Sequence, residues 1–260
     1  MNWLKLEGRT AVVSGAASGI GRGIAEEMGR NGVRVAILDI DEHGARETAE
    51  IVRSMGVEAI ALRVDITSDT DVDDAYSTVM GEWGVVDILV NNAGTSIPDS
   101  YENIALADWN RIIDLNLTGY LRCSQKFGTS MRLNGRGAIV HVASICGSDP
   151  LPRSGAYSPS KAGVLMMSRG IALEWGRYGI RSNCLSPGMT RTTQTEAAYQ
   201  VPGLLAKRVE LTPMGRIASP QDMADVCVWL ASDRASFVTG QDIAVDGGII
   251  QTTLTHTTAK

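Results

Sequence analysis

Short apolar runs alternate along most of the chain with longer segments whose apolar residues recur at helical spacing. Several of the runs are apolar throughout, which is typical of strands that are buried on both faces of a sheet. The predicted strands cover residues 10–14, 33–38, 59–64, 87–91, 138–143, 181–185 and 242–245. The predicted helices cover residues 20–31, 42–55, 69–83, 107–134, 156–178 and 220–231.

This alternation predicts the fold class. Strands that alternate with helices are joined by right-handed crossovers, so the strands run parallel and helices cover both faces of the sheet. We therefore expect an α/β protein with a doubly wound parallel sheet of about seven strands. No linker, internal repeat or low-complexity tract interrupts the pattern, and the prediction is a single domain over residues 1–260.

Segment 188–219 breaks the alternation. It begins at Gly188, after Pro187, is interrupted by further prolines and glycines, and contains no clear strand. An insertion at the carboxyl edge of a parallel sheet is a common place for a substrate lid. We expect a lid here, and the alternative is a long surface excursion without a role.

Composition excludes several classes of function. The net charge is −5 and no basic run is present, so nucleic acid and anionic membranes are poor partners. No stretch is apolar for long enough to cross a bilayer, and the first residues lack the apolar core of a signal peptide. The four cysteines form no Cys-x-x-Cys pair, and His43, His141 and His256 do not cluster with them. We expect no metal site, and a reducing cytoplasm as the location.

The first predicted strand runs directly into a glycine-rich turn that opens a helix. Gly15, Gly19 and Gly21 would let backbone approach a pyrophosphate, to which the helix N-terminus offers N–H groups and partial positive charge. Asp39 ends the second strand, where a carboxylate can accept hydrogen bonds from an adenosine ribose and would repel a 2′-phosphate. No Arg or Lys stands in the turn, so NAD is favoured over NADP. The alternatives are a turn that needs glycine for steric reasons and an aspartate that caps the next helix.

Tyr157 and Lys161 are four residues apart in a predicted helix, so their side chains share one face. An ammonium beside a phenol favours the phenolate, and we expect Lys161 to lower the pKa of Tyr157 from its usual value of about 10. Such a tyrosine could exchange a proton with an alcohol oxygen that Ser144 also holds. The alternative is a chance pair of surface residues.

Further motifs accompany these residues: Asp65 after the third strand, Asn91-Asn92-Ala93-Gly94 after the fourth, Asn116 in a helix, Pro187-Gly188 with Thr192, and Val245-Asp246-Gly247-Gly248. Together with Ser14-Gly15 and the thirteen-residue step from Ser144 to Tyr157, they resemble the motifs of the short-chain dehydrogenase/reductase family, in the same order. The family has threonine where Ser14 stands, and serine keeps the hydroxyl. The resemblance covers roughly residues 6–250.

The resemblance implies a Rossmann-type fold with NAD over the carboxyl ends of the strands. It implies that Ser144 holds the substrate oxygen, Tyr157 exchanges its proton and Lys161 binds the nicotinamide ribose, while Asn116 holds a water that links Lys161 to solvent. The implied cofactor contacts are Gly15, Ser18, Gly19, Ile20, Gly21, Asp39, Asp65, Ile66, Asn92, Ala93, Gly94, Tyr157, Lys161, Pro187, Gly188, Thr190 and Thr192. The implied assembly is a homotetramer or a homodimer.

The substrate is predicted from the polarity of the segments near the catalytic residues. Ser144, Cys146, Arg153 and Tyr157 are the predicted substrate contacts, and the wider pocket candidates are Ser96, Ile145, Asp149, Pro150, Ser154, Met189, Arg191 and Gln194. Many of these are polar and the chain has only two phenylalanines, which favours a polyol or sugar derivative over a bulky apolar alcohol. Arg153 or Arg191 could instead receive an acidic group. The alternative functions are a 3-oxoacyl-thioester or general carbonyl reductase, and an NAD-binding sensor or scaffold without catalysis.

Overall fold

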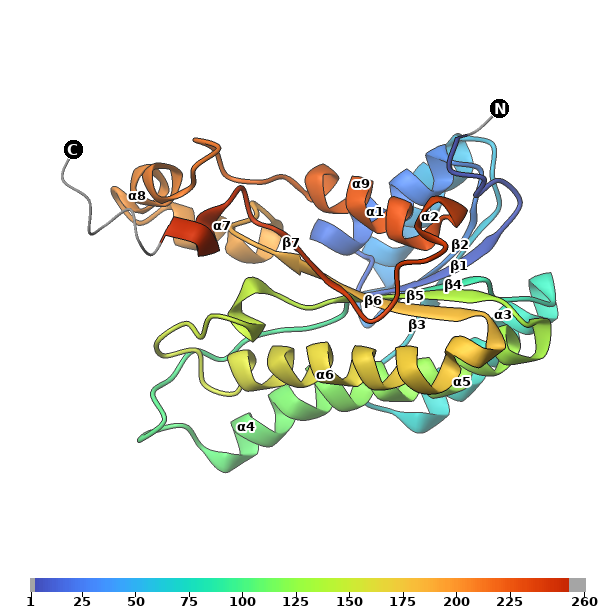
Figure 1. Ribbon diagram of the computed structural model, residues 1–260, viewed down its shortest axis with the longest axis horizontal. Helices are drawn as coiled ribbons and strands as arrows, with labels where there is room; N and C mark the ends of the chain where they lie inside the picture. Colours follow the sequence, from blue (N-terminus) through green and yellow to red (C-terminus); the bar gives the residue numbers. More distant parts are fainter. Residues whose placement is uncertain (1–2, 253–260) are drawn as a thin grey trace.

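The computed structural model describes residues 3–252, in which seven parallel strands form one sheet with the order β3-β2-β1-β4-β5-β6-β7 (Figure 1). The predicted doubly wound α/β fold is confirmed, and His256 lies outside the described residues. The strands are β1 (Thr10–Ser14), β2 (Arg34–Asp39), β3 (Ala59–Arg63), β4 (Ile88–Asn91), β5 (Gly137–Val142), β6 (Ile180–Pro187) and β7 (Asp242–Val245). The helices are α1 (Gly19–Arg30), α2 (Glu42–Ser54), α3 (Asp69–Trp83), α4 (Leu106–Ile113), α5 (Gly119–Asn134), α6 (Tyr157–Trp175), α7 (Thr193–Tyr199), α8 (Leu204–Leu211) and α9 (Pro220–Ala231).

The central strands are covered by a layer of helices on each face. Along β1, Ala11 and Val13 pack with residues of α1, α2 and α9, whereas Val12 packs with residues of α3, α5 and α6. Figure 1 shows α1 and α9 above the sheet and α5 and α6 below it. Because successive side chains of a strand point to opposite faces, burial on both faces explains why this run has no polar alternation.

The strand order reverses between β1 and β4. β2 and β3 extend the sheet on one side of this pair, and β5, β6 and β7 extend it on the other. The loops that follow β1 and β4 therefore leave in opposite directions at the carboxyl edge, which is where open parallel sheets bind their ligands. The fold places the glycine turn of residues 15–21 and the segment 92–95 at this point.

The structure corrects the predicted helix 107–134. It consists of α4 and α5, separated by a π-helical turn at Asp114–Thr118. Such a turn holds an extra residue and resets the direction of the side chains, and it is too short to change the apolar periodicity of the sequence. Asn116 lies within this turn and is fully buried.

Segment 188–219 contains the short helices α7 and α8, which the sequence pattern did not predict. Thr190 and Ala218 pair as an isolated parallel bridge, so the two ends of the segment are held together. Thr192 caps α7 by accepting a hydrogen bond from the N–H of Thr195, which explains where that helix begins.

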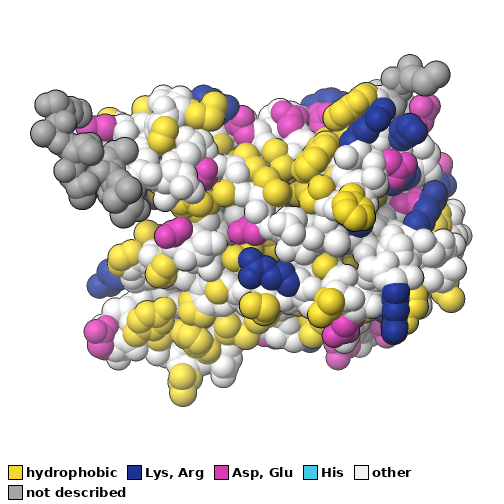
Figure 2. All heavy atoms as spheres, in the orientation of Figure 1, with side chains coloured by type: hydrophobic (Ala, Val, Ile, Leu, Met, Phe, Trp, Pro, Cys, Tyr) yellow, Lys and Arg dark blue, Asp and Glu magenta, His cyan; other side chains and the backbone are white. Residues whose placement is uncertain are grey.

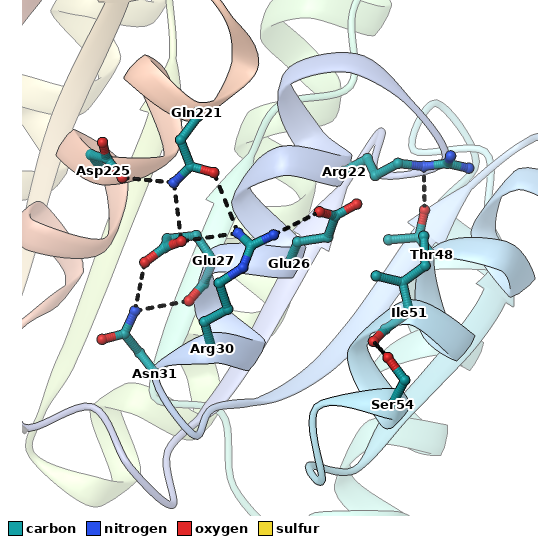
Figure 3. A network of polar contacts seen from close by, with 10 residues as sticks. All are labelled: Arg22, Glu26, Glu27, Arg30, Asn31, Thr48, Ile51, Ser54, Gln221 and Asp225. Atoms are coloured by element: carbon teal, nitrogen blue, oxygen red, sulfur yellow. Dashed lines mark hydrogen bonds and ion pairs between the residues drawn. The ribbon is translucent and has the colours of Figure 1, made fainter.

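Polar contacts tie α1 to its neighbours at the surface (Figure 3). Arg30 pairs with Glu27 on the same helix at 3.0 Å, and Gln221 of α9 donates a hydrogen bond to Glu27 at 3.0 Å. Arg22 donates from α1 to Thr48 of α2 at 2.9 Å. Exposed ion pairs of this kind contribute about 0–1 kcal/mol each. These contacts therefore set how the helices lie against one another, while apolar packing supplies most of the stability.

The surface carries charges of both signs. Figure 2 shows basic and acidic side chains scattered among apolar ones on one face, without a broad basic patch there. Within residues 3–252, none of the helices combines the length and the apolar character needed to cross a membrane.

The two phenylalanines of the chain offer a matched test of the core. Phe127 is fully buried and meets Tyr76 edge-on with ring centroids 5.8 Å apart, whereas Phe237 is fully exposed. We expect Phe127→Ala to lower the free energy of unfolding by about 3–5 kcal/mol, because it removes buried area and leaves a cavity. Phe237→Ala should change it by less than about 0.5 kcal/mol. Urea unfolding followed by circular dichroism measures both, and equal losses would contradict the assignment of the core.

Candidate active site

The glycine turn closes against the end of β4. A Cβ on Gly15, whose φ is +64°, would lie 2.5 Å from the Cα of Ala93, and one on Gly21 would lie 2.2 Å from the carbonyl oxygen of Gly15. Only glycine allows these approaches, so the backbone of the turn stays bare. Asn92 fixes the junction, because its amide donates to the carbonyls of Ser14 and Gly15 at 3.1 and 2.8 Å.

The start of α1 is open to an anion. Ser18 stands at the N-cap, but its side chain makes no capping hydrogen bond. The first N–H groups of a helix have no partner within the helix, and they carry its partial positive charge. The predicted contacts Gly19, Ile20 and Gly21 form this first turn. These residues fit the pyrophosphate of a dinucleotide, which would satisfy the open donors.

Asp39 lies beside the glycine turn. Its carboxylate accepts hydrogen bonds from the N–H groups of Ala17 at 2.9 Å and of Asp41 at 3.0 Å. The residue that caps α2 is Asp41, which accepts from the N–H of Gly44 at 3.1 Å. The capping alternative for Asp39 is therefore wrong, and its carboxylate is partly exposed at the edge of the crevice.

The loop after β3 is held by Asp65. Its carboxylate accepts from the N–H and the hydroxyl of Thr67 at 2.9 and 2.7 Å. Ile66 is buried against α5, where a Cβ on Gly119 would lie 2.8 Å from its Cδ1 atom. Asp65 thus lies at the carboxyl edge with the other predicted contacts, and Ile66 packs beneath it.

The side-chain amide of Asn116 uses both its nitrogen and its oxygen in hydrogen bonds. It donates to the carbonyl of Thr95 at 2.9 Å and accepts from the N–H of Thr95 at 3.0 Å, and it also donates to Ser160 at 3.2 Å. The position of a Cβ on Gly94 lies 3.1 Å from the Oδ1 of Asn116 and 3.7 Å from the Nζ of Lys161. Asn116 and Lys161 therefore border the same small space beside Gly94.

Lys161 is buried, with 3% of its surface exposed. Its ammonium donates to the carbonyl of Val142 at 2.8 Å and to the hydroxyl of Tyr120 at 3.3 Å. It lies 5.1 Å from the ring centroid of Tyr120 and 5.8 Å from that of Tyr157. Burial lowers the pKa of Lys161 to about 8, because removal from water disfavours the charged form.

Tyr157 begins α6 and lies on the same helical face as Lys161, as the spacing predicts. The expected effect on its pKa is wrong for this structure. Burial raises the pKa of Tyr157, and a hydrogen bond with Ser144 opposes that rise only in part. The ammonium of Lys161 donates its hydrogen bonds to Val142 and Tyr120 and not to Tyr157.

Ser144 is buried at the end of the loop that follows β5. Its oxygen accepts a hydrogen bond from the N–H of Cys146 at 3.1 Å, which fixes the side chain at the start of a short helical turn. The structure therefore brings Ser144, Tyr157, Lys161 and Asn116 together at the carboxyl edge of β4 and β5, as expected from the sequence.

The segment after β6 reaches back over the glycine turn. A Cβ on Gly19 would lie 3.5 Å from the Cβ of Thr192, and the hydroxyl of Thr190 donates to the carbonyl of Gly188 at 3.3 Å. On α7, Gln194 donates to the hydroxyl of Thr95 at 3.5 Å. The predicted cofactor contacts from Pro187 to Thr192 thus connect the end of β6 to the start of α1.

The remaining substrate candidates lie in the segments that follow β4, β5 and β6, and these segments are here called the rim of the site. Cys146 is half-buried next to Ser144, and Arg153 is exposed with a left-handed φ of +59°. The other exposed candidates are Ser96, Asp149, Pro150, Arg191 and Gln194, while Ile145 and Met189 are half-buried and Ser154 is buried.

Tyr120 and the carbonyl of Val142 contact Lys161 but were not predicted from the sequence. Tyr120 lies four residues after Asn116 on the same helical stretch, and this spacing is the one signal that could have placed it near the site. A backbone carbonyl leaves no signal in the sequence.

His141 is a core residue. Its ring nitrogens lie 3.1 Å from the amide of Asn91 and 3.2 Å from the hydroxyl of Ser182, and burial lowers its pKa to about 3. In the described part of the chain, no group of three or more His, Cys, Asp or Glu residues could hold a metal ion.

Known proteins match almost the whole chain. A family model described as enoyl-(acyl carrier protein) reductase matches residues 15–250. The 3beta-hydroxysteroid dehydrogenase 1 of Eggerthella lenta is 37% identical over 246 residues, which are 94% of each chain. The D-threitol dehydrogenase of Mycolicibacterium smegmatis is 36% identical over 244 residues, again 94% of each chain. A structure from Agrobacterium tumefaciens with bound NADP superposes with a TM-score of 0.89 at 31% identity, covering 96% of this chain and 100% of that one.

The family match, the sheet order and the grouping of site residues agree with one another. The chain belongs to the short-chain dehydrogenase/reductase family, whose enzymes use NAD(P) to interconvert alcohols and carbonyl compounds.

Proposed function

We propose that the protein is an NAD-dependent dehydrogenase that oxidises a polar secondary alcohol, such as a polyol or sugar derivative, to the ketone. The observation that carries the proposal is the group of Ser144, Tyr157 and Lys161, in which a phenol lies between a buried hydroxyl and a buried ammonium. This group is suited to proton exchange at an oxygen next to the crevice of the sheet.

Ser144, Tyr157 and Lys161 would each have a separate role at the oxygen of the substrate alcohol. A bound NAD would supply the hydride acceptor at this site, in the form of an oxidised, positively charged nicotinamide. Ser144 would donate a hydrogen bond to the substrate oxygen, and Tyr157 would take the hydroxyl proton as a phenolate. Because burial raises the pKa of Tyr157, the phenolate needs positive charge close by, and the ammonium of Lys161 lies 5.8 Å from its ring.

Asn116 would support the path by which the proton reaches solvent. Asn116 and Lys161 border the space beside Gly94, where a larger side chain would lie 3.1 Å from the Asn116 oxygen. A water in this space would accept from Lys161 and donate to Asn116. Asn116 reaches this space from the π-helical turn at Asp114–Thr118.

Asp39 supports NAD over NADP. Its carboxylate is fixed beside the glycine turn by the N–H of Ala17, where a 2′-phosphate would meet negative charge. The relative from Agrobacterium tumefaciens was solved with NADP, so membership of the family does not by itself select NAD. The proposal therefore depends on Asp39 and not on family membership.

The polar rim supports a hydroxylated substrate. Ser96, Asp149, Arg153 and Gln194 are exposed around the loops that approach the catalytic group. One relative is a D-threitol dehydrogenase, which acts on a polyol, and another is a hydroxysteroid dehydrogenase. The rim favours the first kind of substrate, because polar side chains can exchange hydrogen bonds with several hydroxyls.

Two further features of the protein are part of the proposal. Segment 188–219 acts as a lid on a single domain, which the contact of Gln194 with Thr95 supports. The protein forms a homotetramer or homodimer, which the exposed apolar side chains Leu133 on α5 and Leu173 on α6 support.

Removal of the Tyr157 hydroxyl tests the mechanism. We expect Tyr157→Phe to lower kcat by roughly 10²–10⁴-fold, since a general acid–base group is lost, while NADH still binds. Turnover is measured by NADH absorbance and binding by NADH fluorescence. Tyr178→Phe, which removes a surface hydroxyl bonded to Arg177, is the control and should keep normal turnover. Near-normal turnover of Tyr157→Phe would rule out the mechanism.

Replacement of Asp39 tests the choice of cofactor. The unmodified protein should have a higher kcat/KM with NAD than with NADP. Asp39→Ala should shift this ratio toward NADP by more than about tenfold, because one lost charge repulsion or ribose hydrogen bond is worth about 1.4 kcal/mol or more. An unmodified protein that prefers NADP would contradict the assignment.

A substrate panel tests the proposed class of alcohol. With NAD, we expect the highest kcat/KM for polyols or sugar derivatives and lower values for hydroxysteroids and aryl alcohols. Acetoacetyl-CoA with NADPH represents the thioester reductase alternative. Activity on apolar alcohols alone would refute the polyol proposal, and NADH binding without turnover on any compound would favour the sensor.

A further inference from the structure

Tyr120 lies beneath the catalytic group, and the mechanism above gives it no role. It stands in the first turn of α5 and is fully buried. Its hydroxyl donates to the carbonyl of Val142 at 3.2 Å and accepts from the ammonium of Lys161 at 3.3 Å. Because Lys161 also donates to Val142 at 2.8 Å, the three groups form a closed triangle of hydrogen bonds.

The ring of Tyr120 is held in one position. It stacks on His141 with centroids 6.1 Å apart and an angle of 24° between the planes. His141 is in turn fixed by Asn91 and Ser182, so the stack rests on strands β4, β5 and β6. A phenol held in this way cannot turn its hydroxyl from Lys161 without displacing buried neighbours.

Other titratable groups near Lys161 keep one charge state around neutral pH. Burial raises the pKa of Tyr120 well above its usual value, so its oxygen remains a neutral acceptor. Burial lowers the pKa of His141 to about 3 and raises that of Cys184 on β6 to about 12. The partial burial of Tyr157 raises its pKa as well. Lys161, with a pKa of about 8, is the group of this set that titrates between pH 6 and 9.5.

We propose that Tyr120 is a positioning residue for Lys161: its hydroxyl accepts a hydrogen bond from the ammonium, favours the protonated lysine and holds it at the end of β5 beside Tyr157. The inference depends on the proposed function of Lys161 and adds a residue that touches neither substrate nor cofactor. Val142 supplies one acceptor to the buried ammonium, and Tyr120 supplies a second together with the face of its ring, 5.1 Å away.

Tyr120→Phe isolates the contribution of the hydroxyl, because it keeps the ring and its stack on His141. NADH binding is measured by fluorescence from pH 6 to 9.5, which requires no substrate. In the unmodified protein, affinity should fall as Lys161 loses its proton near pH 8. In Tyr120→Phe the midpoint should move to lower pH by about half to one unit, the size expected for one hydrogen bond of ordinary strength, because the bond from Lys161 is long at 3.3 Å. At pH 6 the two proteins should bind NADH within about twofold of each other, since both lysines are protonated there.

Two controls separate positioning from packing. Tyr178→Phe removes a hydroxyl at the surface and should keep the midpoint of the unmodified protein. A melting temperature for each variant shows its loss of stability, which by itself would not move a pH midpoint. If Tyr120→Phe does not fold, Tyr120→Met takes its place, because it also lacks the hydroxyl and methionine adapts to irregular cores.

The outcomes distinguish this inference from the proposed function. An unchanged midpoint in Tyr120→Phe would overturn the positioning role and leave the function of Lys161 intact. If Lys161→Met binds NADH with the same pH dependence as the unmodified protein, the proposed function of Lys161 fails, and the role of Tyr120 fails with it. A midpoint shifted downward in Tyr120→Phe alone, with the Tyr178→Phe control unmoved, supports the proposal.

Discussion

Burial of the parallel sheet on both faces is the constraint on which the rest of this structure depends. The side chains of β1 and β4 pack alternately with two helical layers, so these strands have almost no room for polar groups along their length. Two polar residues that do lie within the strands, His141 and Asn91, are paired with each other. Side chains that must meet a ligand are thereby confined to the carboxyl edge, where the strands end.

The close approach between β1 and β4 gives that edge its shape. Gly15 meets Ala93 at a distance that excludes any Cβ, and the amide of Asn92 holds the contact. The uncapped start of α1 consequently follows a turn whose backbone is bare. The carboxylate of Asp39 is bound to the N–H of Ala17 in the same turn. A site for a dinucleotide thus follows from steric limits and unpaired donors in a few residues.

The ammonium of Lys161 links the site to the core. Burying a charge is costly unless acceptors replace the lost water, and here they come from β5 and α5 while the lysine itself lies on α6. The contact requires three elements to take fixed positions, and the stack of Tyr120 on His141 extends that requirement to neighbouring strands. The same contacts therefore serve both the packing of this half of the molecule and the charge that Tyr157 requires.

The sequence by itself determined the succession of strands and helices along the chain. It also determined the glycine turn, Asp39 and the group of Ser144, Tyr157 and Lys161, because apolar periodicity and short-range spacing carry this information. Only the tertiary structure decided the π-helical turn at Asn116 and the helices of segment 188–219, since neither alters a local pattern strongly. It also decided that the pKa of Tyr157 is raised, because burial outweighs the hydrogen bond with Ser144. Contacts such as that of Lys161 with Tyr120 and Val142 join residues that are distant in the chain, and they exist only once the sheet and its helices have packed together.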